Sequence, residues 1–114
     1  MQLFQFDRAE NLIDRFGSIG ATATRVAKGE GRLQLTCLTI AAGGTIGEHP
    51  APVRQIFLVI AGEGWVAGPD GERVPVAAGT GVEWEPGEEH TSGSETGMTA
   101  LALEGTSVEV FTAE

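Results

Sequence analysis

Glycine constrains what this chain can fold into more than any other residue. Seventeen of the 114 residues are glycine, and they separate short apolar segments such as "RLQLTCLTI" and "QIFLVIAG". Turn signals at intervals of about eight to twelve residues are typical of an all-β sandwich or barrel. The best candidate for a helix, residues 9–16, is brief. We therefore expect an all-β domain of short strands.

Length and charge narrow the classes of function. A chain of 114 residues forms one domain with one core, and 41% apolar residues are ordinary for a globular protein. There is no apolar run of about 20 residues and no basic start followed by an apolar stretch, so we expect a cytoplasmic protein with no membrane partner. The net charge is −9 and no lysine or arginine follows Arg73, which also disfavours nucleic acid as a partner.

Two segments predict how the strands are covered. In residues 81–85 the valine and tryptophan face one way and two glutamates the other, as in a strand with one face in solvent. Residues 55–60 differ because both of their faces are apolar. A small β domain has only one core, so we expect a second subunit to cover the other face and the protein to be a homodimer.

Local predictions follow from four further features. The Pro-Asp-Gly sequence within residues 67–74 predicts a hairpin turn, and residues 99–114 predict two strands joined at Gly105. Cys37 is the only cysteine, and we expect it to be a small buried hydrophobe. Arg54 is expected to lie at a rim and to pair with one of the many acids.

Candidate site residues are few. The chain has two histidines, His49 and His90, which are 41 residues apart and each end a strand-to-turn segment. Taken alone, such a histidine is more often a hydrogen-bonded surface residue than a metal ligand. Trp84 shortly precedes His90 and can wall a pocket or fill the core. Neither a nucleophilic triad nor a phosphate-binding glycine loop is visible.

The spacing around these histidines resembles that of a small single-domain cupin. The first cupin motif consists of a glycine, five residues, His-x-His, three or four residues, a glutamate, six residues and a glycine. The corresponding residues here are Gly43, His49, Ala51, Gln55 and Gly62, and the second motif is matched by Gly81, Pro86, Gly87, His90 and Ser94. The resemblance covers about residues 33–104 of a single domain, 1–114. It implies a double-stranded β-helix, the jelly-roll barrel, with residues 1–32 as N-terminal strands packing on it.

The resemblance also implies a metal site, from which this chain departs. Metal-binding cupins resemble a scheme of three histidines and one glutamate around the ion. Here His49 and His90 match two of the histidines, Ala51 has no donor atom, and Gln55 offers a neutral carboxamide oxygen. Glu88 could supply a carboxylate ligand in addition, because alternation along an extended segment puts it on the same face as His90. The implied site is therefore a reduced one for divalent zinc, nickel, iron or manganese.

Three interpretations remain open, and the first is narrowly preferred. The three donors His49, Gln55 and His90 hold a metal with open positions, as in dioxygenase-like or isomerase-like enzymes acting on a small organic molecule. Alternatively, they are polar points in a metal-free pocket that binds a small molecule. In the third, the barrel is a structural or interaction module without catalysis. The expected pocket walls are Phe57, Trp84 and Glu88.

Overall fold

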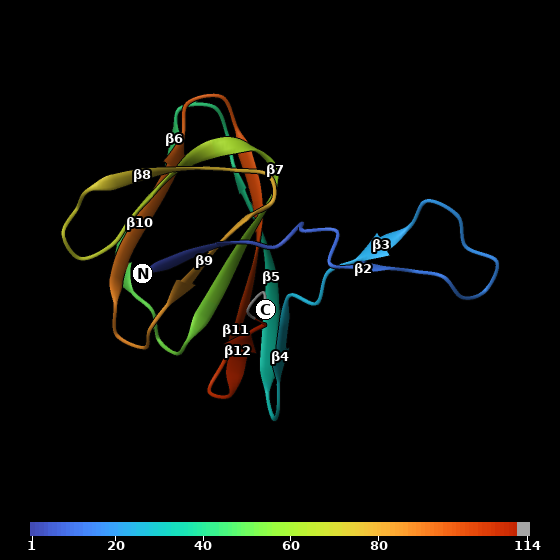
Figure 1. The fold of residues 1–114 in the computed structure, drawn as a ribbon. Helices are drawn as coiled ribbons and strands as arrows, with labels where there is room; N and C mark the ends of the chain where they lie inside the picture. The colour runs from blue at the N-terminus through green and yellow to red at the C-terminus, as the bar shows by residue number, and fades with distance from the viewer. Residues whose placement is uncertain (112–114) are drawn as a thin grey trace.

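The computed structural model describes residues 1–111 of the chain. Over this range it contains twelve strands and no helix, so it offers no helical segment that could cross a bilayer. Eight strands build a barrel (Figure 1): β1 (Gln2–Gln5), β5 (Leu33–Ile40), β6 (Gly44–Pro50), β7 (Gln55–Ala67), β8 (Arg73–Ala77), β9 (Thr80–Trp84), β10 (Glu89–Ser94) and β11 (Met98–Gly105). The predicted all-β jelly-roll barrel is confirmed.

The barrel consists of two antiparallel sheets that share one long strand. The large sheet has the order β5-β11-β7-β9-β1, and the small sheet has the order β6-β10-β7-β8. Residues 55–62 of β7 pair within the large sheet, whereas residues 63–67 pair within the small one. Strand β7, which contains Gln55 and Gly62 of the first motif, therefore passes from one sheet into the other.

Gly62 lies where β7 changes sheets. Its φ is 77°, in the left-handed region, and a Cβ built there would lie 2.2 Å from the carbonyl oxygen of Gly97. Only glycine combines this backbone conformation with so close an approach. The backbone geometry at position 62 therefore requires glycine, independently of the spacing of the first motif.

The core lies between the two sheets. Alternate residues of each strand face inward, and the buried cluster includes Phe57, Val59 and Val82 from the large sheet and Val66 and Val76 from the small sheet. The alternation predicted for residues 81–85 is confirmed, since the valine and tryptophan are buried and the glutamates are not. Removing these apolar side chains from water stabilises the domain.

Two turn predictions are confirmed. The β7–β8 hairpin closes through a hydrogen bond from the Gly71 N–H to the Gly68 carbonyl (3.0 Å), and the Asp70 side chain accepts from the Glu72 N–H (2.9 Å). Beyond β11, the chain turns after Gly105 into β12 (Val108–Val110), which pairs with β4 (Ala27–Gly29). The last three residues of the predicted final strand, 112–114, lie outside the described range.

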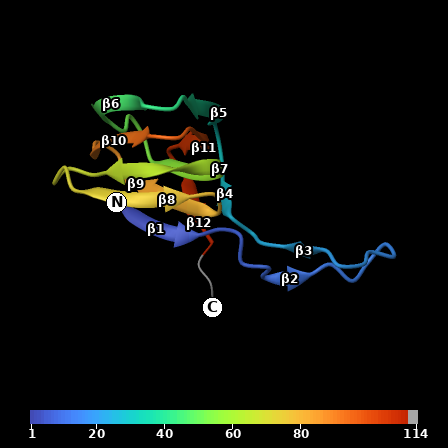
Figure 2. The same cartoon turned by 90° about the horizontal axis from the view of Figure 1, so that it is seen from above.

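The N-terminal segment differs from its prediction. β1 pairs with β9 and so packs on the barrel as expected, but β2 (Asn11–Leu12) and β3 (Thr22–Ala23) form a hairpin that extends away from it (Figures 1 and 2). The candidate helix over residues 9–16 does not form. An eight-residue helix is too short to be stable without packing partners, and Ala9 and Phe16 take positive φ values of 48° and 61°.

The prediction that Cys37 is buried is also wrong. It is exposed rather than buried. The inward positions of β5 are the alternate residues Gln34, Thr36 and Leu38, so Cys37 points to the outside of the large sheet with Leu35. The apolar residues of this strand therefore lie mainly on the side that the core does not use.

Candidate functional site

A cavity of about 250 Å³ opens at one end of the barrel. Four side chains from adjacent strands of the large sheet form its floor, because Gln34, Glu104, Gln55 and Trp84 are successive cross-strand partners. Partners in register point to the same face of a sheet. Gln55, which replaces the glutamate of the first motif, is therefore held in the middle of a polar row.

The two histidines meet across the small sheet. His49 on β6 and His90 on β10 are direct cross-strand partners, and their ring centroids lie 4.3 Å apart with a 57° angle between the rings. His90 is buried, whereas His49 is exposed at the mouth of the cavity. Two residues distant in sequence thus line one cavity together with Gln55.

Backbone carbonyls fix the orientation of both imidazoles. His49 Nδ1 lies 2.7 Å from the carbonyl oxygen of Gly47, and His90 Nδ1 lies 3.0 Å from that of Glu88. A carbonyl only accepts hydrogen bonds, so each neutral ring carries its proton on Nδ1 and has a lone pair on Nε2. Neither Nε2 has a hydrogen-bond partner within residues 1–111.

The charge state of His90 follows from its surroundings. Burial lowers the pKa of His90 below its ordinary value, the hydrogen bond to the Glu88 carbonyl acts in the opposite direction, and nearby His49 adds to the lowering. His90 is therefore neutral at physiological pH. A neutral imidazole whose Nε2 is unpaired can accept a hydrogen bond or a proton from a bound molecule.

Two aromatic side chains pack beside the His90 ring. Trp84 stacks on it with centroids 4.1 Å apart and 21° between the rings, and Phe57 meets Trp84 edge-on at 5.4 Å. Both aromatic residues are 1% exposed and line the cavity. The indole N–H of Trp84 has no hydrogen-bond partner in the described part of the chain. A buried donor of this kind is uncommon in folded proteins.

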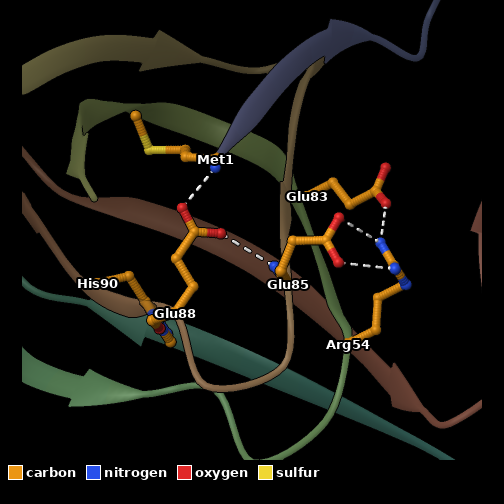
Figure 3. A network of polar contacts seen from close by, with 6 residues as sticks. All are labelled: Met1, Arg54, Glu83, Glu85, Glu88 and His90. Atoms are coloured by element: carbon orange, nitrogen blue, oxygen red, sulfur yellow. Dashed lines mark hydrogen bonds and ion pairs between the residues drawn. The ribbon is translucent and has the colours of Figure 1, made fainter. Parts of the chain in front are cut away.

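Glu88 does not line the cavity, which differs from the prediction. Its carboxylate contacts the amino group of Met1 and accepts from the Glu85 N–H at 2.9 Å, as Figure 3 shows. Burial alone would raise the pKa of Glu88, but these two contacts lower it below its ordinary value. Glu88 lies in the turn before β10, where strand alternation does not hold, so only its backbone carbonyl reaches the histidine.

Glu104 is the acid that sequence reasoning missed. It lines the cavity opposite the histidines, is partly exposed, and makes no ion pair or side-chain hydrogen bond among residues 1–111. The signal was present in "ALALE", because Ala100 and Ala102 face the core and period-two alternation puts Glu104 on the same side. Gln34 and Ser92 line the cavity too and were not predicted.

Arg54 is engaged outside the cavity. Its guanidinium makes a two-pronged contact with Glu85 at 3.1 and 2.8 Å and also contacts Glu83 (Figure 3). The prediction that it pairs with an acid at a rim is confirmed. Among residues 1–111, no lysine or arginine lines the cavity.

The donor set does not fit a resident divalent metal ion. Ala51 is buried at 1% exposure and contributes no donor, and Gln55 is neutral. Within residues 1–111 no three histidine, cysteine, aspartate or glutamate side chains lie close enough together to hold an ion. Two neutral imidazoles and one carboxamide leave the charge of a divalent cation unbalanced.

Comparison with known proteins identifies the family. A family model described as the cupin domain matches residues 37–105, more than half of the sequence. The chain therefore belongs to the cupin family. A search of curated proteins found no match.

Solved structures share the fold at low sequence identity. A cupin superfamily protein from Desulfitobacterium hafniense is 15% identical, with a TM-score of 0.60 over 91% of this chain and 97% of its own. A predicted oxalate decarboxylase from Thermotoga maritima is 22% identical, with a TM-score of 0.56 over 68% and 65%. The DMSP lyase DddQ from Ruegeria pomeroyi is 22% identical, with a TM-score of 0.60 over 78% and 43%.

These similarities define the architecture and not the activity. The chain spans slightly less than two thirds of the Thermotoga protein and under half of the lyase, but nearly all of the Desulfitobacterium protein. The described roles range from a lyase to unknown function. One barrel therefore hosts several chemistries, and function has to be argued from the cavity.

Proposed function

We propose that this protein binds a small organic molecule of neutral or positive charge in the cavity, without a resident metal ion. The observation that carries the proposal is the composition of the lining. Over the described range, 1–111, it combines one unpaired carboxylate, Glu104, with two imidazole Nε2 lone pairs and no lysine or arginine side chain. A metal-dependent enzyme was narrowly preferred from the sequence, but the donor set disfavours it.

The size of the cavity limits the ligand. A volume of about 250 Å³ is below the usual range for drug-sized ligands and accommodates roughly ten non-hydrogen atoms. The aromatic floor of Phe57 and Trp84 and the apolar side chains Leu38 and Ile46 favour a compact apolar body. A single aromatic or aliphatic ring with one polar substituent meets these requirements.

The charge of the cavity selects among such molecules. An anionic ligand would meet Glu104 and, in the part of the chain that the structure describes, find no ammonium or guanidinium in the lining to offset its desolvation. A ligand with N–H or O–H donors finds acceptors in His49, His90 and Gln55, and a cationic one also finds Glu104. Carboxylates are therefore disfavoured, and amines and alcohols are favoured.

Three matched probes test the proposal. Benzylamine, benzyl alcohol and benzoate share one ring and differ in charge, so a thermal-shift titration isolates the charge preference. We expect stabilisation by benzylamine, weaker stabilisation by benzyl alcohol, and none by benzoate. Glu104→Gln should remove the preference for the amine over the alcohol. Glu72→Gln, in the exposed β7–β8 turn, is the control and should leave both responses unchanged.

Two results would contradict the proposal. Stabilisation by benzoate alone would show that the charge argument is wrong. Stoichiometric zinc, nickel, iron or manganese in untagged protein, lost in His49→Ala, would show that the three donors hold an ion after all.

A further inference from the structure

A second hollow of about 200 Å³ adjoins the cavity at the ends of β5 and β11. Gln34 and Glu104, which are cross-strand partners, line both spaces. The remaining wall of the second hollow, which we call the side hollow, includes Arg32 and Val53. Because the same two side chains border both spaces, a molecule seated in the cavity can extend past Glu104 into the side hollow.

Arg32 lies on the cavity side of the large sheet. It precedes β5 by one residue, and period-two alternation from Gln34 and Thr36, which line the cavity, puts it on the same face. Its backbone is held against the end of β11, because a Cβ built at Gly105 would lie 3.2 Å from the Arg32 carbonyl oxygen. The residue is exposed. The position of Arg32 is therefore fixed by the sheet, while its long side chain can turn towards a molecule in the side hollow.

Arg32 and Glu104 carry opposite charges, and neither is paired. Among residues 1–111, every other lysine and arginine contacts a carboxylate or an aromatic ring, whereas Arg32 contacts neither. Glu104 is opposite Gln34 in the register, so Arg32 is its diagonal neighbour. Diagonal neighbours on one face of a sheet are about 7–8 Å apart. This separation leaves space for a small head group between the two charges.

We propose that the cavity and the side hollow together bind a zwitterion of the α-amino acid class. Its ammonium group contacts Glu104, its carboxylate contacts Arg32, and its side chain fills the cavity. The inference rests on the function proposed above and specifies the class of ligand. An α-amino acid carries both charges on one carbon atom, so a single head group reaches both residues. The planar guanidinium also matches a carboxylate with two parallel hydrogen bonds.

The positions of the two charges distinguish a zwitterion from a simple carboxylate. Benzoate can approach Arg32 only by placing its carboxylate beside Glu104, with no ammonium group between them. Benzylamine contacts Glu104 but leaves Arg32 without a partner. A zwitterion satisfies both residues and is net neutral, which agrees with the limit on ligand charge derived from the cavity lining.

Two further probes test the class of ligand. Phenylglycine is benzylamine with a carboxylate on the carbon that carries the amine, and mandelate has a hydroxyl in place of that amine. In isothermal titration calorimetry, we expect at least one enantiomer of phenylglycine to bind with a Kd about 5-fold or more below that of benzylamine. Both enantiomers of mandelate should bind more weakly than this, because they lack the ammonium group.

Variants of Arg32 test where the carboxylate binds. Arg32→Gln should raise the Kd of phenylglycine by about 5-fold or more and leave that of benzylamine unchanged, and Arg32→Lys should recover part of the loss. Arg15→Gln removes the same charge from the exposed loop of the β2–β3 hairpin. It is the matched control and should bind phenylglycine like the wild type. Urea unfolding verifies that each variant is folded.

The failure of this inference differs from the failure of the proposed function. If benzylamine binds but neither enantiomer of phenylglycine binds more tightly, the amino-acid class is wrong and the proposed function stands. The same conclusion follows if Arg32→Gln leaves the Kd of phenylglycine unchanged. If neither benzylamine nor phenylglycine binds, the proposed function is wrong and this inference is wrong with it.

Discussion

At the scale of single residues, the buried imidazole of His90 links the site to pH. Because burial lowers its pKa in the folded protein, the unfolded chain binds more protons below its ordinary pKa of about 6.5. The unfolding free energy therefore rises with pH in that window, and the contribution of His90, complete above about pH 6.5, is lost as the pH falls from there towards the lowered pKa of the folded state.

The prediction is a His90-dependent loss of stability at acid pH. Urea unfolding measured between about pH 7.5 and 5.5 should give a midpoint that falls towards acid pH. In His90→Gln the fall should be smaller, since the amide does not titrate. The comparison of the two slopes separates His90 from the many carboxylates. Equal slopes would show that His90 is not held neutral by burial.

Residue positions were predictable only where strand alternation applied. Gln55 and Phe57 could be placed on the same face of a strand, and period two also determines Glu104, although it was not applied there. Glu88 could not be placed, because a turn residue has no face until its φ and ψ angles are known. The same limit applies to the contact between Glu88 and Met1, which joins residues 87 positions apart.

At the scale of elements, the sheet-changing bend of β7 depends on one glycine. Gly62→Ala must adopt a φ of 77° and also place its Cβ against the Gly97 backbone, so we expect destabilisation of more than about 2 kcal/mol. Gly87→Ala is the matched control. Gly87 has a similar φ of 82°, but a Cβ there meets nothing within 4 Å, so it should cost only about 1 kcal/mol. Chemical denaturation of both variants measures the difference, and equal losses would contradict the role of the close approach.

The strand pattern of the barrel was predictable because it is local, and the β2–β3 hairpin was not. Glycine-bounded apolar segments gave the barrel strands, since each strand needs only alternation and a turn. Residues 9–23 have apolar side chains without a regular period, and their structure depends on what covers them. The sequence contains no local signal for a hairpin that leaves the barrel. Cys37 was misplaced for a related reason, because β5 has an apolar outward face and a polar inward one.

At the scale of the whole molecule, the charge imbalance opposes folding. Sixteen acidic side chains against seven basic ones concentrate negative charge on a small surface. Sodium chloride screens this repulsion, so we expect the melting temperature to rise by a few degrees between low salt and about 0.5 M salt. Differential scanning calorimetry measures the change, with sucrose of matched osmolality as the uncharged control. A fall in melting temperature would show that the ion pairs of Arg54 outweigh the general repulsion.

The cavity is a property of the whole barrel. It depends on contacts between strands that are distant in sequence, namely β6 with β10 and β5 with β11. The family spacing predicted that the two histidines approach each other. It could not predict that, among the described residues, the Trp84 N–H is unpaired and no lysine or arginine lines the cavity, because both depend on side chains from six strands.

The position of β6 at the edge of the small sheet has a kinetic consequence. This strand pairs only with β10, whereas the strand of His90 is paired on both sides. Edge strands separate from a sheet at a lower free energy than interior ones. We therefore expect β6, which carries His49, to separate from β10 more readily than the strands of Trp84 and His90 separate from the sheets, and exchange of the proposed ligand to depend on the hydrogen bonds along this edge and not on unfolding of the barrel.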